Sequence, residues 1–362
     1  MSVGPVIPPS GGVGGVVGAG GSPQAGAGAA PPAAPAAAPG AVAVPSGLSA
    51  VISEDLAAQD SLAPLLADLS AALQSGGVPA SARTTVQQIL QLLTPLDASV
   101  TGQSLRAAVA QSGLFLEAGL AATAQAPNDP GAALLLASDL KALLLRLPVD
   151  LAGQSEIAAQ ALAAEILAPD PAARRTNPRP PPPVAGGPTA GQPAAAASIG
   201  AGTDAGAQRQ TLSHEAHAAL ARLELMQLAS AAKPGAPPRW AFELPMASPT
   251  GAGAGMAQFE ISRDAPQGGH TGTDLEPVWR ARFSLHLDAA GPVHAEVALH
   301  SGRTRVTLWA EGEPLRAGLA AGHAELTAAL AGPEGGDAAV RVVSGAPPRP
   351  EAQAGQLVNR TS

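Results

Sequence analysis

The chain has 362 residues and a formal net charge of −8, with 42 glycines, 37 prolines and no cysteine. The absence of cysteine excludes disulfides, thiolate catalysis and cysteine-ligated metals. The negative charge argues against a nucleic-acid backbone as partner, because that partner needs clustered Lys and Arg. All aromatic side chains except Phe115 lie between residues 240 and 309, so we expect the well-packed core in that segment.

Residues 1–46 are expected to be a disordered N-terminal segment. No charged side chain precedes Glu54, and glycines interrupt the valines between Gly11 and Gly21. The segment lacks the basic start and the compact apolar run of a secretory signal peptide. It also has too few large apolar groups to offset the chain entropy lost on folding. No stretch of the chain reaches the roughly 18 apolar residues of a membrane span without Gly or Pro.

Residues 47–170 are predicted to form a series of short helices, because aliphatic side chains recur there at spacings of three and four. The expected helices cover 62–73 before Gly76, 86–93 before Pro95, 105–120 through Gly113, and 134–147 before Pro148. Isolated helices of this length need packing to persist. The region is therefore either a helical bundle without a site or a surface that binds a partner.

Residues 171–210 have the composition of a Pro/Ala/Gly linker. The proline run from Pro180 to Pro183 should be extended and stiff, at about 3.1 Å per residue. A short helix is predicted over 211–233, ending near Pro234. Its apolar stripe consists of Leu212, Ala216, Leu220, Leu223 and Met226.

Strict alternation of apolar and polar side chains predicts three strands between residues 279 and 310. The first strand presents Trp279, Ala281, Phe283, Leu285 and Leu287 on one face. Turn residues at 288–292 and 301–303 separate it from strands over 293–299 and 305–310. The first two strands should form a hairpin or a tight meander.

The period changes after the third strand, where leucines at spacings of four and three predict an amphipathic helix over 315–330. Pro314 suits the first turn of a helix, and Gly332 supplies the stop. A last strand is predicted over 339–343. Helix and strands together describe an α+β unit.

The expected fold class is therefore an α+β C-terminal core over 238–347, made of a β-hairpin or meander with one packed amphipathic helix. It follows a long disordered N-terminus, a helical middle region and a Pro-rich linker, and it precedes a tail at 348–362. We expect the core to fold by itself, with everything upstream serving as a tether.

One short motif comes near to a metal site. His214-Glu215-Ala216-His217 spaces its histidines by three, whereas a zinc-binding helix of this type needs a spacing of four. A solvated helix start is the preferred interpretation. The glycine-rich run 251–255 lacks the Lys-Ser/Thr of a phosphate loop and is expected to be a flexible connection.

Three further histidines, His286, His294 and His300, fall on the outward side of the predicted hairpin. They could approach one another across two strands, but polar cross-strand pairs on a solvated face are ordinary. The acidic residues show no spacing that suggests acid/base catalysis. We therefore expect no enzyme activity, no metal site and no cofactor.

The order of elements near the C-terminus resembles a known family. Between Leu285 and Val293, a strand with alternating leucines is followed by a turn that contains glycine and by the start of a strand rich in valine. The later helix opens at 315–319 with an aliphatic residue, Arg, Ala, a small residue and Leu. This order resembles the C-terminal core domain of flagellar hook-length control proteins. Lead-in strands at 240–245 and 258–264 are similar to those of the family. The resemblance extends from the first of these strands to about residue 347.

The resemblance implies a protein that is cytoplasmic before export and is then secreted through the flagellar type III apparatus to the hook. It would measure or time hook growth and switch export from hook to filament substrates through its C-terminal core, without bond chemistry. The implied partners are the cytoplasmic domain of the flagellar export gate protein and the hook and hook-cap proteins. The chain is expected to act as a monomer, without nucleic acid.

Candidate residues for core packing or partner contact surround the predicted hairpin and the start of the helix. They are Leu285, Leu287, Gly291, Pro292, Val293, Trp309, Leu315, Arg316 and Leu319. The helix leucines are expected to pack on the sheet, whereas Arg316 is either a contact or a solvated residue. Trp309 falls opposite Leu308, so either the sheet is covered on both faces or this indole is exposed to a partner.

The sequence departs from the family pattern in two places. The upstream region is rich in Ala and Leu where many members are polar, and Thr327 stands where a cation is expected in the core helix. An alternative interpretation is a non-flagellar, Pro/Ala-rich envelope or extracellular scaffold with a small β-rich interaction domain. Normal flagella after deletion of the core would favour that alternative.

Overall fold

The structure is a computed structural model that describes residues 46–97, 99–124, 130–163, 179–200, 202–231, 236–248, 253–264, 277–287, 290–332 and 336–348. The expected disordered N-terminal segment, which the resemblance implies to be the export segment, lies outside the described residues except for Ser46, and so does nearly all of the expected C-terminal tail. The described residues belong to one compact unit. No described helix combines the length and the apolar character that a membrane span requires.

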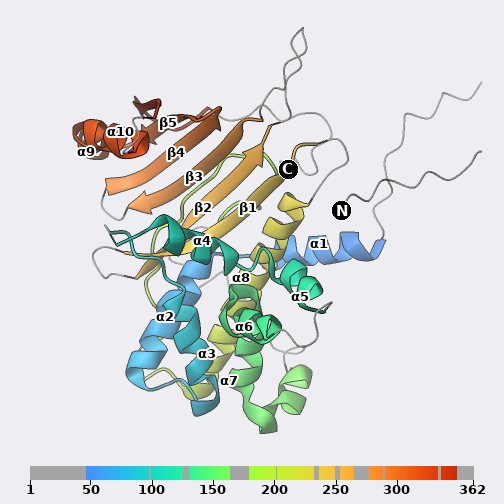
Figure 1. The fold of residues 1–362 in the computed structure, drawn as a ribbon. Coiled ribbons are helices and arrows are strands. Elements are labelled where there is room, and N and C mark those ends of the chain that lie inside the picture. The colour runs from blue at the N-terminus through green and yellow to red at the C-terminus, as the bar shows by residue number, and fades with distance from the viewer. Residues whose placement is uncertain are drawn as a thin grey trace, which may run out of the picture. The chain divides into compact units, whose positions relative to one another are not determined.

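Eight helices precede the sheet in the described part of the chain (Figure 1). They are α1 (Ser46–Ala58), α2 (Leu62–Ser75), α3 (Ala80–Gln91), α4 (Gly102–Ala110), α5 (Leu116–Ala124), α6 (Gly131–Ser138), α7 (Leu140–Ala163) and α8 (Ala205–Ser230). Local signals set several of their ends. The Ser61 side chain accepts a hydrogen bond from the Ala63 N–H at the start of α2, and Gly76, with φ of 74°, ends this helix.

Several predicted helix boundaries were wrong. The helix expected over 134–147 is split at Asp139 between α6 and α7. The helix expected through Gly113 is broken there into α4 and α5, because Gly113 has a φ of 89° and Leu223 and Lys141 leave no room for a side chain. The stop expected at Pro148 is absent, since α7 continues through this residue. The buried Leu147 and Leu151 flank Pro148 and hold both halves of α7 in the core.

Six strands form one mixed sheet in the order β1-β2-β3-β4-β5-β6. They are β1 (Arg239–Ala247), β2 (Ala254–Arg263), β3 (Trp279–Leu287), β4 (Gly291–His300), β5 (Arg303–Ala310) and β6 (Ala338–Ser344). Neighbouring strands are antiparallel except β5 and β6, which are parallel. A parallel pair needs a crossover, and α9 (Glu313–Ala321) with α10 (His323–Ala331) provides it. The α+β fold class is confirmed.

The single helix expected over 315–330 is two helices in the structure. Gly322 ends α9 and begins α10, and glycine is a poor helix former because its backbone loses the most freedom on folding. The apolar stripe survives the break. Leu319, Leu326 and Leu330 pack together against the same side of the sheet.

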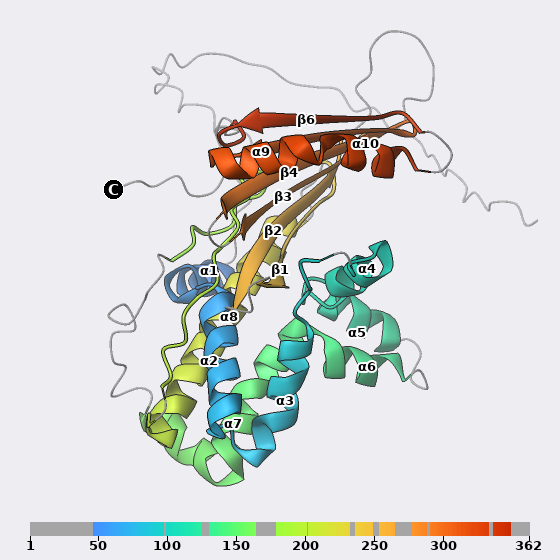
Figure 2. The ribbon, with the colours of Figure 1, turned by 90° about the vertical axis from the view of Figure 1, so that its left-hand side faces the viewer.

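The two sides of the sheet differ in chemistry. We call one the apolar face, whose central row of paired residues is Phe242, Phe259, Phe283, Ala295, Leu308 and Val342. Its three phenylalanines stack with ring centroids 5.2 and 5.3 Å apart. α9 and α10 cover this face over β4 to β6 (Figure 2), and side chains of α4 cover it over β1 and β2. We call the other side the polar face, with the row Glu260, Arg282, Glu296, Thr307 and Arg341.

The largest apolar core lies in the helical region rather than in the aromatic segment, which corrects the expectation from composition. Leucines dominate it, including the fully buried Leu65, Leu69 and Leu143. Leucine reaches high packing density without aromatic rings, so the distribution of Phe and Trp did not reveal this core. Ala254 and Met256 of β2 belong to the same cluster. The helical core therefore extends onto β2, while the apolar face of the sheet has two clusters of its own. The packing of helices against β1 and β2 differs from the expected free-standing C-terminal unit.

Residues 179–200, which fall in the expected linker, run across the polar face, and we call them the strap. Gln192 pairs with Met256 of β2 through two backbone hydrogen bonds of 2.8 and 2.9 Å. The helix expected over 211–233 is also longer, because α8 begins at Ala205 with Asp204 capping its first turn. The strap is therefore part of the folded unit.

Candidate interaction surface

Most candidate residues lie at one end of the sheet, which we call the turn end. Leu287 pairs with Gly291 where β3 turns into β4, and Gly291 has a φ of 88° that only glycine adopts readily. The turn from β5 into α9 lies beside the turn from β3 into β4. Gly312 in the first turn is so close to Ala290 in the second that a side-chain carbon added to Gly312 would stand 3.2 Å from the Ala290 carbonyl oxygen. Pro292 follows directly in β4. The structure thus brings together residues from the hairpin and from the start of α9.

Arg316 and Leu315 lie in the first turn of α9. The Arg316 Nη2 atom is 2.6 Å from the Glu313 Oε1 atom, and both side chains are largely in solvent. A pair of this kind contributes about 0 to 1 kcal/mol to stability. Glu313 is also favoured by the positive end of the helix dipole. Arg316 is accordingly a solvated residue with a carboxylate partner in this structure.

Three other candidates pack inside the protein and do not join the turn end as surface residues. Leu285 belongs to the cluster that faces α4. Leu319 packs with the cluster under α9 and α10, and Val293 is buried in β4. Their part in any activity is to fix the shape of the sheet. Whether any of the nine candidates contacts a partner stays a prediction.

His294 lies on the outward side of the hairpin, as expected, but this side is not solvated there, because His294 is buried. Its Nδ1 atom lies 2.6 Å from the Ser284 hydroxyl, and its Nε2 atom lies 3.4 Å from Glu311 Oε1. Ser284 in turn donates to the Thr189 carbonyl oxygen of the strap at 2.9 Å. The strap therefore covers the outward side of the hairpin at this point.

This Ser-His-Glu series has the residue types of a hydrolase triad, but its geometry serves a different purpose. The Ser284 side chain is 0% exposed and its hydroxyl is engaged with Thr189, so a substrate has no route to it. The series fastens the strap to β3 and β4. Among the described residues, no three His, Asp or Glu side chains gather in a way that could hold a metal ion.

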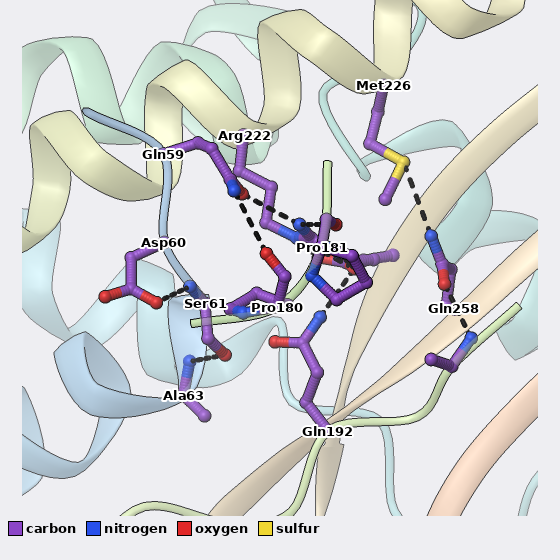
Figure 3. A network of polar contacts seen from close by, with 12 residues as sticks. Gln59, Asp60, Ser61, Ala63, Pro180, Pro181, Gln192, Arg222, Met226 and Gln258 are labelled. Atoms are coloured by element: carbon purple, nitrogen blue, oxygen red, sulfur yellow. Dashed lines mark hydrogen bonds and ion pairs between the residues drawn. The ribbon is translucent and has the colours of Figure 1, made fainter. Parts of the chain in front are cut away.

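A second polar network, centred on Arg222 of α8, joins the helices, the strap and the sheet (Figure 3). Arg222 Nη2 lies 2.6 Å from Glu243 Oε1 in β1, and both side chains are buried. Its Nη1 atom donates to Gln59 Oε1 at 2.9 Å and to the Pro181 carbonyl oxygen at 3.1 Å. Gln192 of the strap donates to the same Glu243 oxygen at 2.6 Å. Each of the bonds made by Arg222 and Glu243 involves a charged group, which makes it strong.

Sequence reasoning missed this network, although a signal for it existed. Arg222 directly precedes Leu223 in the apolar stripe of α8, and Glu243 interrupts the apolar run Trp240 to Pro245. A charge within an apolar stripe is rarely buried unless it is paired. Two such interruptions in adjacent segments would have indicated a buried ion pair.

The motif His214-Glu215-Ala216-His217 lies inside α8 and not at a helix start, which corrects the earlier interpretation. Both histidines are exposed, whereas Glu215 turns inward and its Oε2 atom is buried without a hydrogen-bond partner. Burial, followed by the charge and hydrogen bond of the neighbouring Asp68, raises the pKa of Glu215 to about 9. Glu215 is therefore held as a neutral acid at neutral pH.

Asp68, which lies beside Glu215, is bound by the strap. The Ser198 backbone N–H and hydroxyl of the strap donate to its two oxygens, each at 2.5 Å, and the Ile199 N–H donates at 3.0 Å. Asp68 therefore fastens the strap to α2, and its place beside Glu215 contributes to the raised pKa of Glu215.

Together these features define a mixed α+β domain whose candidate residues serve packing and surface contact. Residues 267–351 match the family described as flagellar hook-length control protein FliK. The match includes β3 to β6 with α9 and α10. The match supports the resemblance of this part of the chain to the C-terminal domain of the flagellar hook-length control family, and that resemblance is confirmed. No curated protein and no solved structure matches the chain.

The matched range does not coincide with a boundary in the fold. β1 and β2 lie wholly outside the matched range, yet they belong to the same sheet. The turn end and the candidate residues lie within it. The family is one of flagellar regulators rather than of enzymes.

Proposed function

We propose that this chain is a flagellar hook-length control protein that is exported through the flagellar type III apparatus. It measures or times hook growth and then switches export from hook to filament substrates through its C-terminal domain. The family match over residues 267–351 is the observation that carries this proposal. The protein would act in the cytoplasm before export and at the hook after it.

The partners in this proposal are the cytoplasmic domain of the export gate protein and the hook and hook-cap proteins. The turn end supports a contact role, because Gly291, Pro292 and the start of α9 form a surface whose shape is fixed by buried neighbours such as Val293. Arg316 is available there with only a weak partner. No step of the switch requires bond chemistry.

The helical region constrains how the chain would measure length. Roughly 235 residues precede the core, and fully extended they would span on the order of 700–800 Å at about 3.3 Å per residue. Residues within α1 to α8 reach far less while they stay folded, since a helix rises only about 1.5 Å per residue. We infer that measuring by reach requires the helical region to unfold during export, whereas a timing mechanism does not.

Deleting residues 267–348 from the chromosomal copy tests the proposal. We expect polyhooks and no filaments, because the domain that ends hook growth is missing. The control is the exchange Arg83→Gln on α3, far in sequence from the matched range, which should leave hooks unchanged. Normal hooks and filaments after the deletion would refute the proposed function.

Changing the length of the chain separates measuring from timing. Residues 171–178 precede the strap and lie outside the described residues, so insertions there leave the described contacts in place. If the chain measures by reach, hook length rises in proportion to the inserted residues. If it acts as a timer, hook length stays the same.

A further inference from the structure

The polar face of the sheet is covered unevenly. Over β2 and β3 the strap lies on it: the Gly186 N–H donates to Glu260 at 2.8 Å and the Ala190 N–H donates to Gln258 at 2.7 Å. Thr189 reaches Ser284 at 2.7 Å. This half of the face therefore holds an extended segment through side chains that meet its backbone.

No described element covers the other half, over β5 and β6. α9 and α10 pack on the opposite, apolar face. Trp309 and Thr307 of β5 are partly exposed, and Arg305 and Arg341 are exposed. In register, Thr307 stands beside Arg341 and Trp309 beside Val343. An indole and an isopropyl group thus lie next to two cations on an open surface.

The charges on this face divide into two groups. Arg239 and Arg282 pair with Glu260, Arg280 pairs with Asp264 and Glu296, and Arg303 pairs with Asp337. Arg305 and Arg341, in contrast, form no ion pair with any described residue. Carboxylates are abundant in this chain, whose net charge is −8. Because no described carboxylate pairs with Arg305 or Arg341, the surface around these two residues carries a local surplus of positive charge.

We propose that the polar face of β5 and β6 binds an extended acidic segment of a partner protein, with carboxylates on Arg305 and Arg341 and an apolar side chain against Trp309 and Val343. Arg and Trp are the side chains that contribute most to protein interfaces. Carboxylate is the group that a guanidinium recognises with two hydrogen bonds. The strap over β2 and β3 shows that the same face of the sheet accepts an extended chain.

The strand geometry sets the spacing of the ligand. Side chains on one face of a strand recur every two residues, at about 6.6 Å. Arg305, Thr307 with its neighbour Arg341, and Trp309 therefore form three successive positions along β5. An extended segment that runs along β5 would present acidic, acidic and apolar side chains at positions i, i+2 and i+4.

A polyanion such as nucleic acid fits this surface less well. Binding to a phosphate backbone draws on many cations in a row, whereas this face offers, beside an apolar group, two cations that have no ion-pair partner in the described part of the chain. The chemistry of the surface thus favours a peptide. The inference does not depend on the proposed flagellar function, because it concerns binding by the purified chain.

The test measures fluorescence anisotropy of a labelled peptide, Ser-Glu-Ser-Glu-Ser-Leu-Ser, with the purified full chain. A peptide with Gln in place of Glu is the ligand control. The double variant Arg305→Gln/Arg341→Gln should weaken binding of the acidic peptide about tenfold or more, equivalent to about 1.4 kcal/mol. The matched variant Arg83→Gln/Arg106→Gln removes the same charge from exposed positions on α3 and α4 and should change binding less than about twofold.

Three results would overturn the inference. The first is equal binding of the acidic peptide and its Gln counterpart by the unaltered chain. The second is the same affinity for the two double variants, which have the same net charge. The third is tighter binding of oligothymidylate through the same two arginines. Arg305→Gln and Arg341→Gln change exposed side chains, and matching circular dichroism spectra would establish that the variants are folded.

Discussion

Arg222 of α8 and Glu243 of β1 form a two-point ion pair inside the protein, with Nε 2.9 Å from Oε2 and Nη2 2.6 Å from Oε1. The two side chains are only 4% and 9% exposed. The same guanidinium binds Gln59 after α1 and Pro181 of the strap. One side chain thereby connects the helices, the strap and the first strand of the sheet.

Replacing one member of this pair should be costly. Arg222→Met leaves the Glu243 carboxylate buried without its partner, and we expect the free energy of unfolding to fall by about 3–5 kcal/mol. Urea denaturation measures the change. The control is Arg316→Met, whose exposed pair with Glu313 should contribute at most about 1 kcal/mol. Losses of equal size for the two variants would show that Arg222 has no special role.

Glu215 should make stability depend on pH in an unusual direction. Its pKa is raised from 4.5 to about 9 in the folded protein, so the unfolded chain releases this proton at lower pH than the folded one. Between about pH 4.5 and 9 this residue therefore lowers stability progressively as the pH rises. Glu215→Gln removes the titration and should raise the melting temperature more at pH 8 than at pH 5. A gain of the same size at both values would contradict the assignment.

The close approach of the strap to the sheet predicts a strong effect at Gly191. A side-chain carbon there would overlap the backbone of Leu285 and His286 in β3. Gly191→Ala should reduce stability by about 1–3 kcal/mol and expose the strap to protease. Gly200→Ala, where a side-chain carbon meets nothing within 4 Å, is the matched control. Equal protease resistance of the two variants would mean that the strap is not held as described.

The strands were predictable because their signal is local. Alternation with period two between Trp279 and Ala310 places each side chain on a face without any knowledge of tertiary contacts, and the structure has these strands. The helix boundaries failed where a distant contact decided them. α7 passes Pro148 because Leu147 and Leu151 are both buried, and no local pattern reports such burial.

The positions of the candidate residues in the fold were also predictable where local signals decide them. The order of turn and helix signals predicts a turn at Gly291 and Pro292 and a helix that starts after β5. In the structure this turn and the start of α9 lie at the same end of the sheet. The burial of His294 could not be predicted from the sequence. The strap that buries it is a Pro-rich stretch, and its composition is that of a linker. Contacts between segments far apart in sequence carry no periodic signal.

Packing under α9 gives a further prediction. Leu319 lies in the cluster between α9 and the sheet, and Leu319→Ala should lower the free energy of unfolding by about 2 kcal/mol. Thermal unfolding of the purified chain measures this change. Leu299→Ala removes the same atoms from a side chain that is 44% exposed and should have a much smaller effect. A larger loss at Leu299 would contradict the described packing.

The central claim is that helices, strap and sheet unfold as one unit, and two signals recorded in one urea titration test it directly. Trp240, Trp279 and Trp309 all lie in the sheet, so tryptophan fluorescence reports on the sheet while far-ultraviolet circular dichroism is dominated by the helices. The account predicts coincident transitions for both signals, and a common shift of both in Arg222→Met. A sheet signal that persists after the helical signal is lost would show that the C-terminal domain stands alone.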